Sequence, residues 1–233
     1  MEETALIQWS DVRTVLLDMD GTLLDLHFDN HFWLEHMPRR YAEEREVPLE
    51  AARAELLRLY RAVAGTMNWY CLDYWSAKLD MDVAALKEEV DHLIAVHPNV
   101  VAFLDVVRDS GRRVVLVTNA HMKSLTLKME RTRLAGHLDA IICAHDIGVP
   151  KEDPGFWNKL QTVELFVRET TLLVDDSLPV LRSAQEYGMG SLLCVHQPDS
   201  QGPDKDVGEF AAIRGFADIM PPADQLPPTM SAP

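Results

Sequence analysis

Five short apolar segments, rich in branched side chains, limit the folds that are open to this chain of 233 residues. None of them alternates polar with apolar residues, as a strand with one solvent-exposed face would. Each segment is therefore predicted to be a strand that is buried on both faces, as in a parallel sheet. The five segments span residues 14–17, 113–117, 140–143, 171–174 and 191–195.

Amphipathic helical patterns occupy most of the intervals between these strands. Residues 98–110 place apolar side chains on one stripe, and Gly111 follows where a helix would end. Residues 122–134 and 178–187 show similar patterns, and Gly188 ends the second of them. Alternating strands and helices predict a doubly wound α/β domain with a mostly parallel sheet of five or more strands.

One interval is too long for a plain crossover between parallel strands. Residues 26–97 separate the first strand from the next helix–strand unit, and they show helical patterns without a convincing strand. These patterns cover residues 29–46, 49–64 and 83–93. We therefore predict an inserted all-helical domain, which divides the chain into three parts. The parts are a Rossmann-like core (1–25 and 96–220), a helical cap (26–95) and a Pro-rich C-terminal tail (221–233).

The predicted cap also contains nine of the 17 aromatic residues in the chain. Large rings can build the core of a small helical domain, and this interpretation is favoured for any one of them. The alternative is that some of the rings line a pocket for a flat ligand. The nine residues are Phe28, Phe32, Trp33, Tyr41, Tyr60, Trp69, Tyr70, Tyr74 and Trp75.

Composition and charge exclude several classes of protein. The chain is 47% hydrophobic and 25% charged, as ordinary globular proteins are, and its formal charge of −15 disfavours binding to nucleic acids or anionic membranes. Its three cysteines lie far apart without a C-x-x-C pair, which is typical of reduced thiols. The acidic N-terminus does not resemble a signal peptide, and no apolar run reaches the roughly 18 residues of a membrane span. We therefore expect a soluble, cytoplasmic protein.

Polar residues follow four of the predicted strands, at the edge of the sheet where parallel strands place ligands. The first strand leads into the sequence D-x-D-G-T, in which a period of two directs both acids to one side and the glycine permits a sharp turn close to a ligand. The next three strands lead to a hydroxyl and an amide, then to a lysine, and finally to two more acids. In chain order these residues are Asp18, Asp20, Gly21, Thr118, Asn119, Lys151, Asp175 and Asp176.

These residue types indicate the chemistry of a phosphate site. Carboxylate oxygens with few other protein ligands suit Mg²⁺, which keeps several waters and shares a substrate phosphate. A lysine and a threonine hydroxyl suit the phosphate oxygens. Two carboxylates as close as Asp18 and Asp20 repel each other by about 4 kcal/mol at an effective dielectric constant near 20. The set therefore predicts a metal ion and a lysine that together outweigh the surrounding acids.

With these residues the chain resembles the haloacid dehalogenase (HAD) superfamily. The four motifs of that superfamily are matched in order by Asp18-x-Asp20-Gly-Thr, Thr118-Asn119, Lys151 and Asp175-Asp176. The helical insertion resembles the superfamily's cap domain of the first type. Residues 24–33, 68–75 and 150–153 are most similar to the bacterial GMP/IMP-type purine 5′-nucleotidases. The resemblance implies a Mg²⁺-dependent phosphoric monoester hydrolase that acts on a small purine nucleotide.

The resemblance also implies a role for each matching residue. Asp18 is the expected nucleophile, which forms an aspartyl-phosphate, and Asp20 is the expected general acid and then general base. Mg²⁺ is expected to be held by Asp18, the backbone carbonyl of Asp20 and one fourth-motif acid, for which Asp175 is favoured over Asp176. Contact with the metal at Asp18 is expected to separate the pKa values of Asp18 and Asp20. The implied substrate-binding residues are Gly21, Thr118, Asn119 and Lys151.

Two groups of polar cap residues admit alternative interpretations. The first group is spaced so that two histidines could share a helix face, as zinc ligands do, although a polar cap face is favoured because no cysteine or carboxylate completes the set at the usual spacing. The second group could recognise the edge of a 6-oxopurine, but a solvated helix face explains its arginines at least as well. The groups are His27, His31 and His36, and then Arg39, Arg40 and Asn68.

Three classes of function remain open. The leading one is a phosphomonoesterase that acts on purine 5′-nucleotides. The second keeps the superfamily and changes the substrate, as in a sugar-phosphate phosphatase or a phosphomutase; a dehalogenase would not need Asp20. Cleavage of a phosphonate would require a cap lysine, and Lys78 and Lys87 lie in unremarkable helical patterns. The third class, an inactive binding module, is disfavoured because all the motif acids are present.

Overall fold

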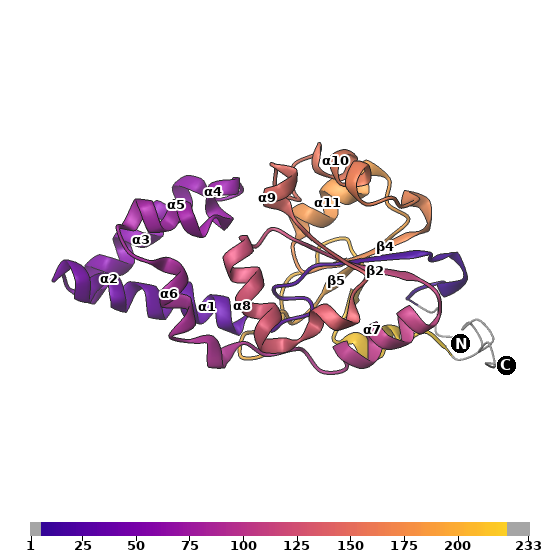
Figure 1. Ribbon diagram of the computed structural model, residues 1–233, viewed down its shortest axis with the longest axis horizontal. Helices are drawn as coiled ribbons and strands as arrows, with labels where there is room; N and C mark the ends of the chain where they lie inside the picture. The colour runs from indigo at the N-terminus through magenta and orange to yellow at the C-terminus, as the bar shows by residue number, and fades with distance from the viewer. Residues whose placement is uncertain (1–5, 223–233) are drawn as a thin grey trace.

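The computed structural model describes residues 6–222 and contains a six-stranded sheet in which every pairing is parallel (Figure 1). The strand order is β3-β2-β1-β4-β5-β6. The strands are β1 (Thr14–Leu17), β2 (Arg113–Thr118), β3 (Ala140–Cys143), β4 (Thr171–Asp175), β5 (Ser191–Val195) and β6 (Ala212–Ile213). The predicted doubly wound sheet of five or more strands is confirmed. The sixth strand has two residues, which is too short to produce a recognisable pattern.

Successive side chains of the central strands enter two separate hydrophobic clusters, as the absence of alternation predicts. Val15 and Leu17 pack in the cluster that contains α7 and α8, whereas Leu16 packs with α10 and α11 on the other face. Figure 1 shows α7 on one side of the sheet and α10 and α11 on the other. These helices are α7 (Val100–Asp109), α8 (Met122–Thr132), α9 (Ala144–Ile147), α10 (Phe156–Val163) and α11 (Leu178–Tyr187). Burial on both faces fixes the register of the strands, and with it the positions of the residues that follow them.

Between β1 and α7, residues 26–95 form helices that lie to one side of the sheet, and we call these residues the cap (Figure 1). Among the described residues the cap contains no strand, although Leu24 just before it makes an isolated bridge to Val96 just after it. Its helices are α1 (His27–His31), a π-helical turn (Phe32–His36), α2 (Met37–Arg45), α3 (Leu49–Val63), α4 (Met67–Tyr70), α5 (Leu72–Leu79), α6 (Val83–Glu88) and a 3₁₀ turn (Asp91–Leu93).

The first predicted cap helix is continuous in the structure but changes its winding at the π-helical turn. Pro38 follows this turn and has no amide hydrogen to donate to the preceding helical turn, so regular α-helical bonding is interrupted there. Such turns often occur at functional sites. This one contains Trp33, which lines the cavity described below.

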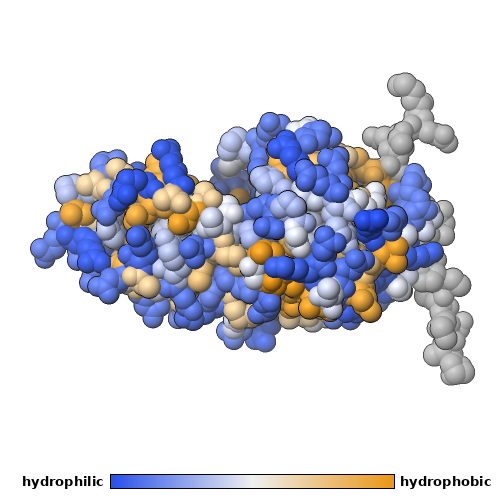
Figure 2. Space-filling model, turned by 90° about the horizontal axis from the view of Figure 1, so that it is seen from above, coloured by the Kyte–Doolittle hydropathy of each residue, from blue (hydrophilic) through white to orange (hydrophobic). Residues whose placement is uncertain are grey.

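The outer surface agrees with the acidic composition. Hydrophilic residues cover most of the face in Figure 2, and hydrophobic residues form small, separate patches on it. Within residues 6–222, no helix is both long enough and apolar enough to cross a membrane. Residues 223–233 of the predicted Pro-rich tail lie outside the described residues.

Candidate active site

The first motif forms a tight loop at the carboxyl end of β1. The amide of Asp18 donates to the Val174 carbonyl at 3.0 Å, which extends the pairing with β4, and the Gly21 amide donates to the Leu24 carbonyl at 2.7 Å. Gly21 has a φ of +87°, and a Cβ atom on it would lie 2.9 Å from Cγ of Asp176. A side chain at this position would therefore push the loop away from the second pair of acids.

Lys151 connects three of the strand ends. Its ammonium group donates to Asp18, to Oδ2 of Asp175 at 2.7 Å and to the Val117 carbonyl at 3.0 Å, and its side chain is buried. Its amide donates to Oδ1 of Asn119 at 2.9 Å, which holds the loop after β3 against the end of β2. Burial alone would lower the pKa of Lys151, but Asp175 and Asp18 outweigh burial and raise it, so the lysine is charged.

Three buried carboxyl groups meet beside this lysine. The carboxylate oxygens that Asp18, Asp175 and Asp176 offer lie within 4.8 Å of one another. Burial raises the pKa of all three acids, and that of Asp18 reaches about 6 against the opposing effect of Lys151. A crowded set of hard oxygen ligands in which ionisation is costly fits a divalent cation such as Mg²⁺.

The two fourth-motif acids differ in their hydrogen bonds. Oδ1 of Asp175 accepts from the Ser177 amide at 2.9 Å and Oδ2 accepts from Lys151, so both of its oxygens are engaged. Oδ2 of Asp176 accepts from Lys205 at 2.9 Å, and within residues 6–222 no group donates to its other oxygen. These bonds favour Asp176 rather than Asp175 as a direct metal ligand, which is the reverse of the preference drawn from the sequence.

Asp20 belongs to a second charged network, which was not predicted from the sequence. Lys128 on α8 donates to Oδ1 of Asp20 and to Oδ2 of Asp29, at 2.6 Å each. Lys87 on α6 donates to Oδ1 of Asp29 at 2.5 Å. The description of Lys87 as unremarkable is therefore wrong: it is buried and lines the cavity. A feature of the sequence that could have indicated this network is Lys128, a lysine at a position on the buried face of its helix.

The pKa values of the two acids in this second network shift in opposite directions. Burial raises the pKa of Asp20 to about 6, although Lys128 acts in the opposite direction. Burial also acts to raise the pKa of Asp29, but Lys128 and Lys87 together outweigh it and hold that pKa at about 2. Asp29 therefore neutralises much of the charge of Lys128, and Asp20 can bind a proton near neutral pH.

The second motif, Thr118-Asn119, lies at the end of β2 and forms hydrogen bonds within the site. Oγ1 of Thr118 accepts from the Ala120 amide at 3.0 Å. The Asn119 side chain donates to Oε2 of Glu152 at 2.9 Å, and Oε1 of Glu152 accepts from the Tyr70 hydroxyl of the cap at 2.8 Å. Glu152 was not predicted as a site residue, although it lies next to Lys151. It couples the second and third motifs to the cap.

A single cavity of about 300 Å³ joins the motifs to the cap. Seven of the eight predicted site residues line it, and Gly21 is the exception. Four of the nine cap aromatics also line it, and others, such as Phe32 and Trp75, are fully buried in the cap core. The core interpretation therefore fits the buried rings, and the lining rings lie where the alternative interpretation requires them. The four lining aromatics are Trp33, Tyr60, Trp69 and Tyr70.

Two groups of polar cap residues considered as possible zinc or purine sites do not line this cavity. The first group is His27, His31 and His36. Among the described residues, no potential metal-binding group contains His27, His31 or His36, and His36 is 2.9 Å from a Glu89 carboxylate oxygen, so the favoured polar-face interpretation fits. The second group, which contains two arginines, does not line the cavity either. Each of these arginines pairs with a glutamate on the helix surface. That group comprises Arg39, Arg40 and Asn68.

The fold and the site together define an α/β enzyme that receives a small anionic substrate between a parallel sheet and a helical cap. The family model for "haloacid dehalogenase-like hydrolase" matches residues 12–188. The chain belongs to this family of hydrolases.

Individual relatives support the same assignment. The chain is 38% identical over 215 residues to "GMP/IMP nucleotidase YrfG" of Escherichia coli (strain K12), which covers 92% of this chain and 97% of that protein, and the Shigella flexneri protein of the same name matches equally. These similarities confirm the predicted family and the predicted enzyme class, a phosphoric monoester hydrolase.

Solved structures support the fold. A HAD phosphatase from Thermococcus onnurineus superposes with a TM-score of 0.73 at 22% identity, covering 89% of this chain and 95% of that one. A hydrolase from Pseudomonas syringae superposes with a TM-score of 0.63 at 17% identity, covering 88% and 95%.

Proposed function

We propose that this hydrolase is a Mg²⁺-dependent phosphomonoesterase that cleaves purine 5′-nucleoside monophosphates through an aspartyl-phosphate on Asp18. The observation that carries the proposal is one cavity with four carboxylates and Lys151 on its core side and four aromatic rings on its cap side. The first set suits a phosphate and the second suits a flat base. The printed name of the relative that is 38% identical supports a purine substrate.

The charges around the cavity support the need for a divalent cation. Five carboxylates pair there with four lysines, so the entry of a phosphate dianion would leave a large negative excess. Asp18 and Asp176 would hold Mg²⁺, while Asp175 keeps Lys151 in place. When bound, the ion would supply positive charge to the phosphoryl oxygens and favour the ionised form of Asp18.

The first half of the reaction uses both acids of the first motif. A carboxylate oxygen of Asp18 forms a bond to phosphorus as the bond between phosphorus and the 5′ oxygen breaks. Asp20 gives its proton to that leaving oxygen, so the nucleoside departs as a neutral alcohol. Lys151 and the Thr118 hydroxyl stabilise the charge on the phosphoryl oxygens in the transition state.

The second half restores the enzyme. Asp20, now ionised, takes a proton from a water molecule whose oxygen attacks the phosphorus of the aspartyl-phosphate. The bond from phosphorus to Asp18 breaks, inorganic phosphate leaves, and Asp20 is again protonated. Lys128 stays bound to Asp29 throughout, so the charge that faces Asp20 changes little between the two steps.

The cap aromatics support a nucleobase in the outer part of the cavity. Trp33, Tyr60 and Trp69 contact one another with ring centroids 5.5–6.0 Å apart, which keeps their planes fixed. A purine that stacks against such a wall gains about 1–3 kcal/mol. A sugar phosphate without a base would not make this contact.

The test is phosphate release, with Mg²⁺ present, from a panel of purine and pyrimidine 5′-nucleotides, ribose 5-phosphate and glucose 6-phosphate. We expect GMP and IMP to show the highest kcat/KM. Equal rates across the panel would leave a generic phosphatase, and a preference for a sugar phosphate would support the alternative substrate class. Transfer of the phosphoryl group to another hydroxyl without phosphate release would indicate a phosphomutase.

A further inference from the structure

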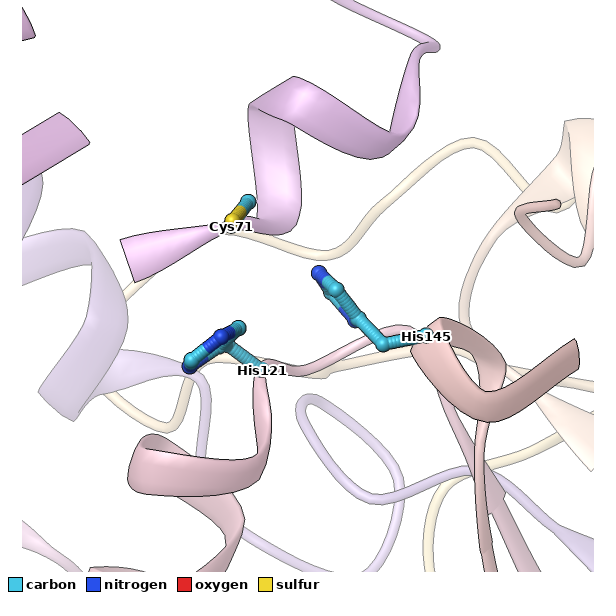
Figure 3. A group of neighbouring side chains, drawn as sticks. All are labelled: Cys71, His121 and His145. Carbon is cyan, nitrogen blue, oxygen red and sulfur yellow. The ribbon is translucent and has the colours of Figure 1, made fainter. Parts of the chain in front are cut away.

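Outside the acidic site, three side chains from separate segments converge at the boundary between the cap and the core (Figure 3). Cys71 precedes α5 of the cap, His121 precedes α8, and His145 lies on α9 after β3. The ligand atoms that they offer, one sulfur and two nitrogens, lie within 4.8 Å of one another. Sulfur and imidazole donors differ from the hard oxygens around Asp18 and suit a borderline-soft transition metal.

One nitrogen of this cluster lacks a hydrogen-bond partner in the described part of the chain. Nε2 of His145 is buried, and within residues 6–222 it has no hydrogen-bond partner. Figure 3 shows this ring extending toward the other two side chains. Cys71 is a free thiol whose sulfur accepts a 3.4 Å hydrogen bond from the Tyr74 amide. A buried, unpartnered imidazole nitrogen is costly unless another group binds it.

We propose that Cys71, His121 and His145 bind one Zn²⁺ ion and thereby join the cap to the core. In a tetrahedral site with Zn–S near 2.3 Å and Zn–N near 2.0 Å, ligand atoms are about 3.5 Å apart, so binding requires only a small closure. The carboxylate of Asp73 lies beside the cluster, with its Oδ2 3.6 Å from Nε2 of His121, and a water molecule can fill the fourth position of the ion. That carboxylate already binds Lys123 at 2.6 Å, which keeps it beside the cluster.

An ion at this position restrains the cap at the rim of the catalytic cavity. His121 also lines that cavity, and the neighbours of Cys71 in the chain, Tyr70 and Leu72, line it as well. Substrate entry and product release require the rim to open. Occupancy by Zn²⁺ therefore slows turnover, even when Mg²⁺ saturates the acidic site.

The test uses the full-length protein and Co²⁺ as a spectroscopic probe for Zn²⁺. Co²⁺ bound by a thiolate gives a charge-transfer band in the near ultraviolet that a carboxylate site cannot give. We expect one Co²⁺ per chain with this band, displaced by Zn²⁺, in the wild type and in Asp18→Asn. The band is lost in Cys71→Ser, and His145→Gln weakens binding by at least about 100-fold, because even outer partners of metal ligands contribute about 10–100-fold.

Matched controls separate this site from other metal binding. Cys194→Ser changes a buried thiol on β5, and His92→Gln changes an exposed cap histidine, and both variants keep the band. The proposal is overturned if no band appears, if Cys71→Ser retains it, or if His145→Gln binds Co²⁺ as tightly as the wild type. Each binding result is independent of phosphatase activity, so the site can fail while the proposed function stands.

Discussion

The core and the cap contribute to the cavity in different ways. The core contributes charged and polar groups from the ends of parallel strands, where Asp18, Thr118 and Asp175 are fixed by the register of the sheet. The cap contributes rings and Lys87 from the faces of short helices, which are positioned by packing against one another. Under the proposed function, the core carries out the bond-breaking chemistry and the cap selects the substrate. Variants in the two regions should therefore change different kinetic constants.

The largest expected effect is in the core, at Asp18. Replacing Asp18 by Asn keeps the shape of the side chain and removes the nucleophile, so kcat should fall by about 10⁴–10⁶-fold, as for other nucleophile deletions. Phosphate release in single-turnover and steady-state assays measures this loss. A normal circular dichroism spectrum shows that the fold is intact, and wild-type turnover by such a folded variant would disprove the mechanism.

Removal of divalent ions also tests the chemistry proposed for the core. Excess EDTA should lower activity by about 100-fold or more, because several kcal/mol of charge stabilisation depend on the ion, and added Mg²⁺ should restore it. The expected loss should be the same for GMP and for a small phosphate ester, since the ion acts at the phosphate. Undiminished turnover in EDTA would exclude a required metal.

Substrates with different leaving groups test whether Asp20 acts as the general acid. The Asp20→Asn variant should lose about 10²–10⁴-fold in kcat with a nucleotide, which is the usual contribution of a general acid–base group. With p-nitrophenyl phosphate the loss should be smaller, because this leaving group departs without a proton. Equal losses on both substrates would show that Asp20 is not the acid.

In the cap, Trp69 tests recognition rather than chemistry. Replacing it by Ala should raise KM for GMP by about 5–150-fold, which corresponds to 1–3 kcal/mol of lost stacking, and should leave kcat nearly unchanged. The KM for ribose 5-phosphate should change little. The control is Tyr74→Leu, a cap aromatic that packs on Trp75 and is not among the lining residues in the described part of the chain. A fall in kcat for both substrates would place Trp69 in the chemistry and remove the contrast.

The smallest effect is expected where the two regions meet, at Tyr70. Tyr70→Phe removes the 2.8 Å hydrogen bond to Glu152 and should cost about 0.5–1.5 kcal/mol, or roughly 2–10-fold in kcat/KM. Glu152→Gln keeps a hydrogen-bond acceptor for Tyr70 and serves as the matched comparison. A loss as large as that of Asp20→Asn would show that the cap takes part in catalysis directly.

The core was largely predictable from the sequence, because buried parallel strands leave continuous apolar runs and their carboxyl ends share one edge of the sheet. The sequence alone therefore predicts that Asp18, Thr118 and Lys151 lie together at that edge. The short strand β6 was missed because two residues carry no periodic signal. The sequence also does not distinguish Asp175 from Asp176 as a metal ligand, since the two adjacent acids differ in the hydrogen bonds that reach them.

The cap was predictable from the sequence only in part. Its helical character was evident from the sequence, since apolar periodicity reports which face of a helix is buried. Periodicity does not report which group that face meets, so the contacts of Lys128 with Asp29, of Tyr70 with Glu152, and of Cys71 with its two histidines emerged only from tertiary structure. The sequence by itself therefore determined the parallel sheet and the catalytic edge. Tertiary structure alone decided which cap side chains face that edge, because helix docking depends on packing between residues that are far apart in the chain.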